Sequence, residues 1–214
     1  MPDDNAYRCA IQTWVVRCEG ITVIVDTGVG NGRDRPQVPL LADLHTDFAD
    51  RLDAAGIDRL GVDYVVNTHI HYDHVGWNTT LADGDWVPTF PNARYLVPQG
   101  DRDYFRSDNA SRMRPPNNDD EAARFAGIRL VYADSITPIE QSGQSVTWEG
   151  EHVINDRLRV ELTPGHTPDS SVLWLNDGGG AVFAGDLLHS PLQVSRPDAV
   201  CSFDLDAETA RASR

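Results

Sequence analysis

Short runs of apolar and β-branched residues alternate along the chain with segments rich in glycine, proline and aspartate. Runs this short, bounded by turn residues, predict β-strands. The expected strands are residues 13–17, 21–26, 62–67, 94–97, 128–132, 146–148, 158–162, 171–175 and 181–184. The last two are joined by Asn-Asp-Gly-Gly-Gly at 176–180, which predicts a hairpin.

Two segments have helical spacing instead. Apolar residues recur every three or four positions over residues 44–55, and Gly56 follows, which predicts a helix that ends there. Asp204 or Asp206 can cap a second helix that begins at Ala207. Because no strand follows this helix, we expect either an incomplete chain or an exposed terminal helix. Strands dominate and helices are interspersed, which indicates a mixed α and β class.

The segment 98–127 differs from its surroundings. It is polar, rich in arginine and aspartate, and interrupted by two consecutive prolines. We expect it to form a lid or surface excursion rather than a linker between domains. A chain of 214 residues suits one hydrophobic core, so residues 1–214 are expected to form a single domain.

Composition excludes several kinds of function. The chain has 33 Asp plus Glu against 18 Lys plus Arg, a net charge of −15, and every one of those cations is arginine. Without lysine there can be no Schiff-base lysine for a pyridoxal cofactor or a carbonyl substrate, and no Walker A loop. The acidity argues against binding nucleic acid, and no apolar run approaches the ~20 residues of a membrane helix. Three unpaired cysteines and no evident signal peptide indicate a cytoplasmic protein.

The candidate chemistry begins directly after the strand predicted at 62–67. His69 and His71 are two residues apart, so an extended backbone points both side chains to the same side, where they can bind one ion. Asp73 and His74 follow in what is predicted to be a turn and can reach a second ion. Imidazole and carboxylate groups suit zinc, although iron, manganese and cobalt use similar ligands.

Two later strands also end in residues that can bind a metal. His166 follows the strand at 158–162 in the sequence Pro-Gly-His-Thr-Pro, and Asp186 follows the strand at 181–184 in the sequence Gly-Asp. Each alone would be read as a turn residue. Together with the first cluster, they supply six ligand residues from the ends of three strands.

This arrangement resembles the metallo-β-lactamase-fold metallohydrolases, and particularly their lactonase and phosphotriesterase members. The match lies in His69-x-His71-x-Asp73-His74, in His166 and Asp186, and in Asp26, which corresponds to the family's supporting aspartate. The resemblance implies an α+β fold, a four-layer αββα sandwich with two divalent metal ions at one edge of the sheets. It further implies that His69, His71 and His166 hold the first metal, that Asp73 and His74 hold the second, and that Asp186 bridges both.

The sequence departs from the family pattern at one ligand of the second metal. The family supplies a further histidine from a strand well beyond the bridging aspartate, whereas the only later histidine here is His189. In the family, that position belongs to a substrate-facing or supporting residue, so His189 is a candidate catalytic residue. We therefore expect the chain to stop before its last ligand, to hold the second metal weakly, or to use His189, with His45 and His152 as weaker substitutes.

The expected activity is hydrolysis by a hydroxide that bridges two metal ions, with Asp73 orienting it or moving its proton. The expected substrate is a small, largely apolar ester, lactone or organophosphate. The aromatic residues that could wall its pocket are Trp77, Trp86, Phe90, Tyr104 and Phe105. The alternative is a metal-binding or regulatory protein with an incomplete second site and no turnover. Expected partners are limited to the small-molecule substrate, with no nucleic acid and no membrane, and a homodimer is left open.

Overall fold

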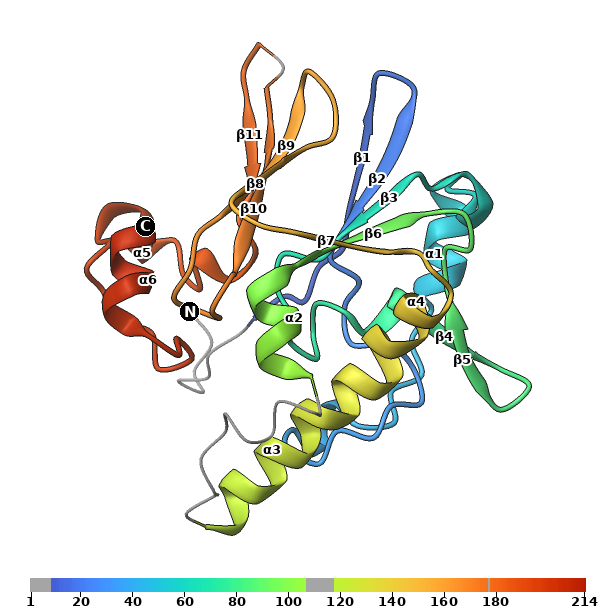
Figure 1. The fold of residues 1–214 in the computed structure, drawn as a ribbon, viewed down its shortest axis with the longest axis horizontal. Coiled ribbons are helices and arrows are strands. Elements are labelled where there is room, and N and C mark those ends of the chain that lie inside the picture. The colour runs from blue at the N-terminus through green and yellow to red at the C-terminus, as the bar shows by residue number, and fades with distance from the viewer. Residues whose placement is uncertain (1–8, 107–117, 177) are drawn as a thin grey trace, which may run out of the picture.

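The computed structural model describes residues 9–106, 118–176 and 178–214, which form two β-sheets with helices around them (Figure 1). The first sheet has the order β1-β2-β3-β6-β7, in which β1 and β2 are antiparallel and the other neighbours are parallel. Its strands are β1 (Trp14–Cys18), β2 (Ile21–Val25), β3 (Tyr64–Val66), β6 (Arg94–Pro98) and β7 (Ser145–Trp148). Parallel strands buried on both faces read as nearly continuous apolar runs, as β2, β3 and β6 do.

The second sheet is antiparallel throughout and has the order β11-β10-β9-β8. Its strands are β8 (Glu151–Val153), β9 (Leu158–Leu162), β10 (Ser171–Leu175) and β11 (Ala181–Phe183). A separate hairpin consists of β4 (Thr79–Ala82) and β5 (Asp85–Pro88). In Figure 1 the hairpin β1–β2 and the strands of the second sheet extend in the same direction.

The helices are mostly short. They are α1 (Phe48–Ala54), α2 (Gln99–Phe105), α3 (Asp119–Val131), α4 (Thr137–Gln141), α5 (Leu192–Ser195) and α6 (Ala207–Ser213). A π-helical stretch, Tyr132–Ile136, joins α3 to α4. Single 3-10 turns lie at Pro39–Leu41, Arg59–Gly61, Gly76–Asn78 and Gly185–Leu187. No helix in the described part of the chain is long and apolar enough to cross a bilayer.

Two apolar clusters lie on opposite faces of the first sheet. Successive strand residues point to opposite faces, so Val65 of β3 enters one cluster and Val66 enters the other. The first cluster packs that sheet against α1, α2, α3 and α4, through side chains such as Phe105 and Ile139. The second cluster fills the space between the two sheets, where Val66 meets Leu173. The order of layers is therefore helices, first sheet, second sheet.

Most of the elements predicted from the sequence are present, within a few residues at their ends. One prediction is wrong: residues 128–132 are not a strand but the end of α3 and the start of the π-helical stretch. Three strands, β4, β5 and β8, were not predicted. The segment 98–127 contains α2 and most of α3, and its residues 107–117 lie outside the described residues. Because Phe105 is buried in the first cluster, α2 is part of the packed domain.

Candidate metal centre

The candidate site is at the carboxyl ends of β2 and β3. These strands are parallel neighbours with Val25 opposite Val66, so the residues that follow them meet at one edge of the sheet. Asp26 follows β2, and its Oδ1 accepts a hydrogen bond of 2.8 Å from the backbone N–H of Thr68. The carboxylate thereby fixes the start of the loop that carries residues 69–74. The second sheet supplies His166 from its β9–β10 loop and Asp186 from the turn after β11.

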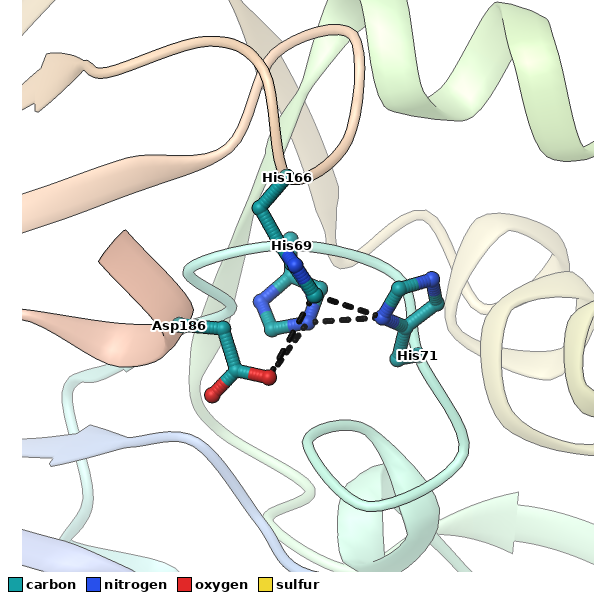
Figure 2. A group of neighbouring side chains, drawn as sticks. All are labelled: His69, His71, His166 and Asp186. Atoms are coloured by element: carbon teal, nitrogen blue, oxygen red, sulfur yellow. Dashed lines mark hydrogen bonds and ion pairs between the residues drawn. The ribbon is translucent and has the colours of Figure 1, made fainter. Parts of the chain in front are cut away.

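Three imidazoles and one carboxylate converge at this edge. Figure 2 shows His69, His71, His166 and Asp186 directed toward one another. Nδ1 of His71 lies 3.1 Å from Nε2 of His69 and 3.0 Å from Nε2 of His166. Oδ2 of Asp186 lies 3.3 Å from Nε2 of His166 and 3.9 Å from Nε2 of His69. All four ligand atoms lie within 4.8 Å of one another.

These separations match those of ligands around one small divalent cation. Four ligands at about 2.0–2.1 Å from a tetrahedral zinc ion are separated from each other by about 3.3 Å. The three nitrogens and the carboxylate oxygen therefore fit one metal ion without a change of strand positions. Without a cation, little free energy would be gained by holding three imidazole nitrogens and a carboxylate oxygen this close together.

The proton positions on the histidines are set by their partners on the far side of each ring. Nδ1 of His74 donates to Oδ2 of Asp26 over 2.8 Å. Nδ1 of His69 lies 3.0 Å from the hydroxyl oxygen of Thr68, whose own proton is directed to Asp26. Both rings thus carry a proton on Nδ1 and turn Nε2 toward the site, the orientation that metal-binding histidines require.

The second predicted pair, Asp73 and His74, lies next to the first group. Nε2 of His74 is 3.3 Å from Oδ1 of Asp186 and 3.8 Å from Oδ2 of Asp73. Asp186 thus directs one oxygen to the first group and the other to His74, the placement of a bridging ligand. All six residues predicted as metal ligands lie together.

Burial and local charge set the protonation of the site. Burial lowers the pKa of His69 and His71 well below its usual value and lowers that of His166 to about 4, so their rings are neutral ligands at pH 7. Although burial opposes ionisation of Asp186, hydrogen bonds from His189 and His74 hold its pKa far below the usual range. Asp186 is therefore already ionised before a metal ion binds.

The same surroundings raise the pKa values of His74 and Asp73. Burial disfavours a charged His74, but Asp26, Asp73 and Asp186 together raise its pKa well above the usual value. Burial raises the pKa of Asp73, His74 opposes that effect, and Asp186 adds to it. A cation that binds to Nε2 of His74 replaces the proton of the charged ring, so binding releases that proton.

His189 lies beside the site without being one of the four converging residues. Its Nε2 is 3.4 Å from Oδ2 of Asp186, and its ring centroid is 4.9 Å from that of His166. His45 is exposed and pairs with Asp43, and His152 lies on β8. Neither of these two belongs to a metal-binding group among the described residues. Of the three histidines considered as substitutes for a further ligand, only His189 lies beside this edge.

A carboxylate that sequence reasoning missed supports His166. Oδ1 of Asp204 lies 3.4 Å from Nδ1 of His166, and its other oxygen accepts a 2.6 Å hydrogen bond from Arg214. Both side chains of this Asp204–Arg214 ion pair are buried. The loop that carries His166 also requires Gly165, where φ is +127° and an added Cβ would overlap the backbone of Ala210 in α6. The site is thus held against α6 by close packing.

Five of the six predicted ligand residues line a cavity of about 1180 Å³, whereas His69 is fully buried. The cavity walls combine polar side chains, such as Gln12, Gln37 and Arg124, with apolar and aromatic ones: Ile11, Ile70, Tyr72, Tyr104, Phe105, Phe125, Ile128 and Phe203. Two of the aromatic residues expected there, Tyr104 and Phe105, line the cavity. The other three do not: Trp77 stacks on Phe48, Trp86 covers Arg33, and Phe90 is in the first cluster.

Comparison with known proteins identifies the family. The profile described as the metallo-β-lactamase superfamily matches residues 6–214. The chain belongs to the metallo-β-lactamase superfamily. Hydrolase AbOPH of the β-lactamase superfamily has the same fold, with a TM-score of 0.72 and 24% identity over 93% of this chain and 64% of its own. AidC, a dizinc quorum-quenching lactonase, is also similar, with a TM-score of 0.61 and 20% identity over 94% of this chain and 65% of its own. The expected α+β metallo-β-lactamase fold is confirmed, and the two apolar clusters of the described residues account for three of its four expected layers.

One curated member of the superfamily extends this comparison. The metallo-β-lactamase fold-containing protein ST1585 of Sulfurisphaera tokodaii is 27% identical over 185 residues, which cover 82% of this chain and 59% of that protein. The chain thus spans 59% of the length of ST1585, and 64% and 65% of the two solved structures. At these identities, the solved structures establish the fold and not the substrate.

Proposed function

We propose that this chain carries the metal centre of a hydrolase that cleaves small, largely apolar esters, lactones or organophosphates. The observation that carries the proposal is the convergence of His69, His71, His166 and Asp186, the last three of which line the 1180 Å³ cavity. A cavity with a few converging polar groups in apolar walls is typical of small-molecule sites.

The chain's own residues divide the work of such a reaction. His69, His71, His166 and Asp186 would hold one divalent ion, and His74 and Asp73 would contribute to a second beside it. When bound, these ions supply Lewis-acid activation of water and of the substrate oxygen. Asp73 is partly exposed to the cavity and is suited to accept a proton from water and pass it to the leaving group.

The cavity walls favour an uncharged substrate. Phe105, Phe125 and Ile128 offer apolar surface, and Arg124 is the only arginine among the described lining residues. An apolar acyl or alkyl group would be desolvated against these walls while its ester or phosphoryl group reaches the floor. The similarity to AidC, a dizinc quorum-quenching lactonase, supports a lactone among these substrates by analogy.

The test measures metal content and turnover on the same protein. Zinc per chain is determined after reconstitution, and hydrolysis is followed with a lactone, an aryl ester, a phosphotriester and a β-lactam. Metal-dependent turnover of one of the first three, lost in Asp186→Asn and retained in the exposed control Asp198→Asn, is expected. Stoichiometric zinc without turnover of any substrate would contradict the proposal and favour a metal-binding or regulatory protein.

A further inference from the structure

Asp101 is a fully buried carboxylate that takes no direct part in the metal centre. It lies in the first turn of α2 and is 0% exposed. Its Oδ2 accepts a hydrogen bond of 2.9 Å from the backbone N–H of Ile70, and its Oδ1 accepts one of 2.9 Å from that of Asp169. One side chain therefore binds two backbone segments that are distant in sequence.

Both segments carry metal-binding residues. Ile70 stands between His69 and His71 in the loop that leaves β3, and Asp169 follows His166 in the loop between β9 and β10. The first loop comes from the first sheet and the second loop from the second sheet. Asp101 thus bridges two parts of the same candidate site from behind.

The contact between α2 and the β9–β10 loop is reciprocal. The backbone N–H of Gly100 donates a 2.5 Å hydrogen bond to Oδ2 of Asp169, while the backbone N–H of Asp169 donates to Asp101. An added Cβ at Gly100 would overlap the Asp169 carboxyl group. We name Gly100, Asp101 and Asp169 the clasp. Its geometry tolerates little change in the distance between the two loops.

Keeping the buried Asp101 of the clasp ionised costs free energy. Burial raises the pKa of Asp101 to about 6, and the two backbone donors only partly offset that effect. The nearby Asp169 has the same charge and adds to the increase. An apolar side chain of similar size would avoid this cost but would leave the N–H groups of Ile70 and Asp169 without acceptors.

We propose that Asp101 is a positioning residue that sets the distance between the His69–His71 loop and the His166 loop, and thereby the affinity of the site for its metal. The inference rests on the metal centre of the proposed function and not on the bond that is cleaved. A merely structural role would lower the free energy of unfolding equally with and without metal. A positioning role lowers the metal affinity of the folded chain itself, as substitutions behind metal ligands do.

The experiment compares Asp101→Asn with Asp103→Asn in the full chain. Asp103 lies on the same helix, its side chain is 43% exposed, and it takes no part in the clasp. Asparagine at position 101 keeps one acceptor oxygen but turns an NH₂ group toward the second N–H. Zinc affinity of the folded, metal-stripped proteins is measured by competition with a chromophoric chelator, and the visible spectrum of the cobalt-loaded proteins reports ligand geometry.

We expect zinc to bind about 10–100-fold more weakly to Asp101→Asn than to the wild type, with altered cobalt bands. For Asp103→Asn, both readouts are expected to match the wild type. Wild-type affinity and an unchanged cobalt spectrum in folded Asp101→Asn would overturn the inference. If Asp101→Asn does not fold, Asp169→Ala decides in the same assay, because it removes the acceptor of the Gly100 N–H and keeps the donor to Asp101.

The two proposals fail in different ways. A wild-type chain that binds zinc and hydrolyses no substrate contradicts only the proposed function. Equal zinc affinity of the wild type and Asp101→Asn contradicts only the role of the clasp.

Discussion

Asp26 accepts a 2.8 Å hydrogen bond from Nδ1 of His74. Through the hydroxyl of Thr68, which donates to the same carboxylate, Asp26 also supports His69. One buried side chain therefore orients a histidine of the first group and a histidine of the second.

This relationship predicts that Asp26→Asn weakens binding at both metal positions. An amide accepts with only one oxygen, so His74 or Thr68 loses its acceptor and a ligand ring can rotate. We expect zinc affinity to fall about 10–100-fold, measured by chelator competition. Asp63→Asn, at the opposite end of β3, where Asp63 accepts from the N–H of Thr22, is the control and should bind zinc as the wild type does. Equal affinity in all three proteins would contradict the role assigned to Asp26.

Asp73 provides a test of proton transfer within the proposed reaction. Its carboxylate is 3.8 Å from Nε2 of His74 and lines the cavity. Asp73→Asn should lower kcat about 10²–10⁴-fold, because loss of a general acid or base costs this much, while the four residues of the first group keep their metal. Steady-state kinetics with metal analysis on the same sample checks this. Asp50→Asn, at an exposed position of α1, is the control, and wild-type kcat in Asp73→Asn would contradict the assignment.

The buried Asp204–Arg214 ion pair predicts a large loss of stability when the Asp204 side chain is removed. Both side chains are buried, so Asp204→Ala leaves the guanidinium of Arg214 without its carboxylate and His166 without its partner. We expect the free energy of unfolding to fall by about 3–5 kcal/mol, measured by urea denaturation of the metal-free chain. The exposed Arg196–Asp198 pair is a matched comparison, and Asp198→Ala should cost less than about 1 kcal/mol. Similar losses in the two variants would contradict this distinction.

The raised pKa of Asp101 predicts a pH dependence of stability with a definite sign. Its pKa is about 6 in the folded chain against the ordinary value of 3.8, so the folded chain binds the proton more tightly than the unfolded chain does. The stability of the metal-free wild type, relative to Asp101→Asn, should therefore fall as pH rises from about 4 to 7, by about 3 kcal/mol. Urea denaturation of both proteins across this range measures the difference. A difference that is constant with pH would show that Asp101 has no such shift.

The sequence predicted the strands of the two sheets well, because their apolar runs are bounded by glycine, proline and aspartate. It failed at residues 128–132, where the short apolar run Ile-Arg-Leu-Val-Tyr resembles a strand in isolation. The apolar positions Ile128, Val131, Tyr132, Ile136 and Ile139 continue at helical intervals, and that longer pattern is the one the structure follows. The hairpin of β4 and β5 was also missed, although its Asp83-Gly84 turn is a hairpin signal.

The candidate ligands could be predicted because each stands at the exit of a strand in a distinctive motif. The residues behind them could not. Asp101 accepts from the backbone, so its partners leave no trace in side-chain identity. Asp204 pairs with His166, 38 residues away, and was considered only as a helix cap, whereas Asp206 is the cap, accepting from the N–H groups of Glu208 and Thr209. Supporting contacts of this kind depend on the packing of distant segments.

The origin of the ligands in two different sheets has a mechanical consequence. His69 and His71 follow a strand of the first sheet, whereas His166 and Asp186 follow strands of the second. The apolar layer between the sheets is non-directional, and the hydrogen bonds of the clasp and of Ser171 to the carbonyl of Thr68 join the sheets at this edge. A cation held by all four residues would add a further cross-link between the two sheets. Loading the site would thus restrict shear between the sheets and slow the exchange of backbone amides far from the ion itself.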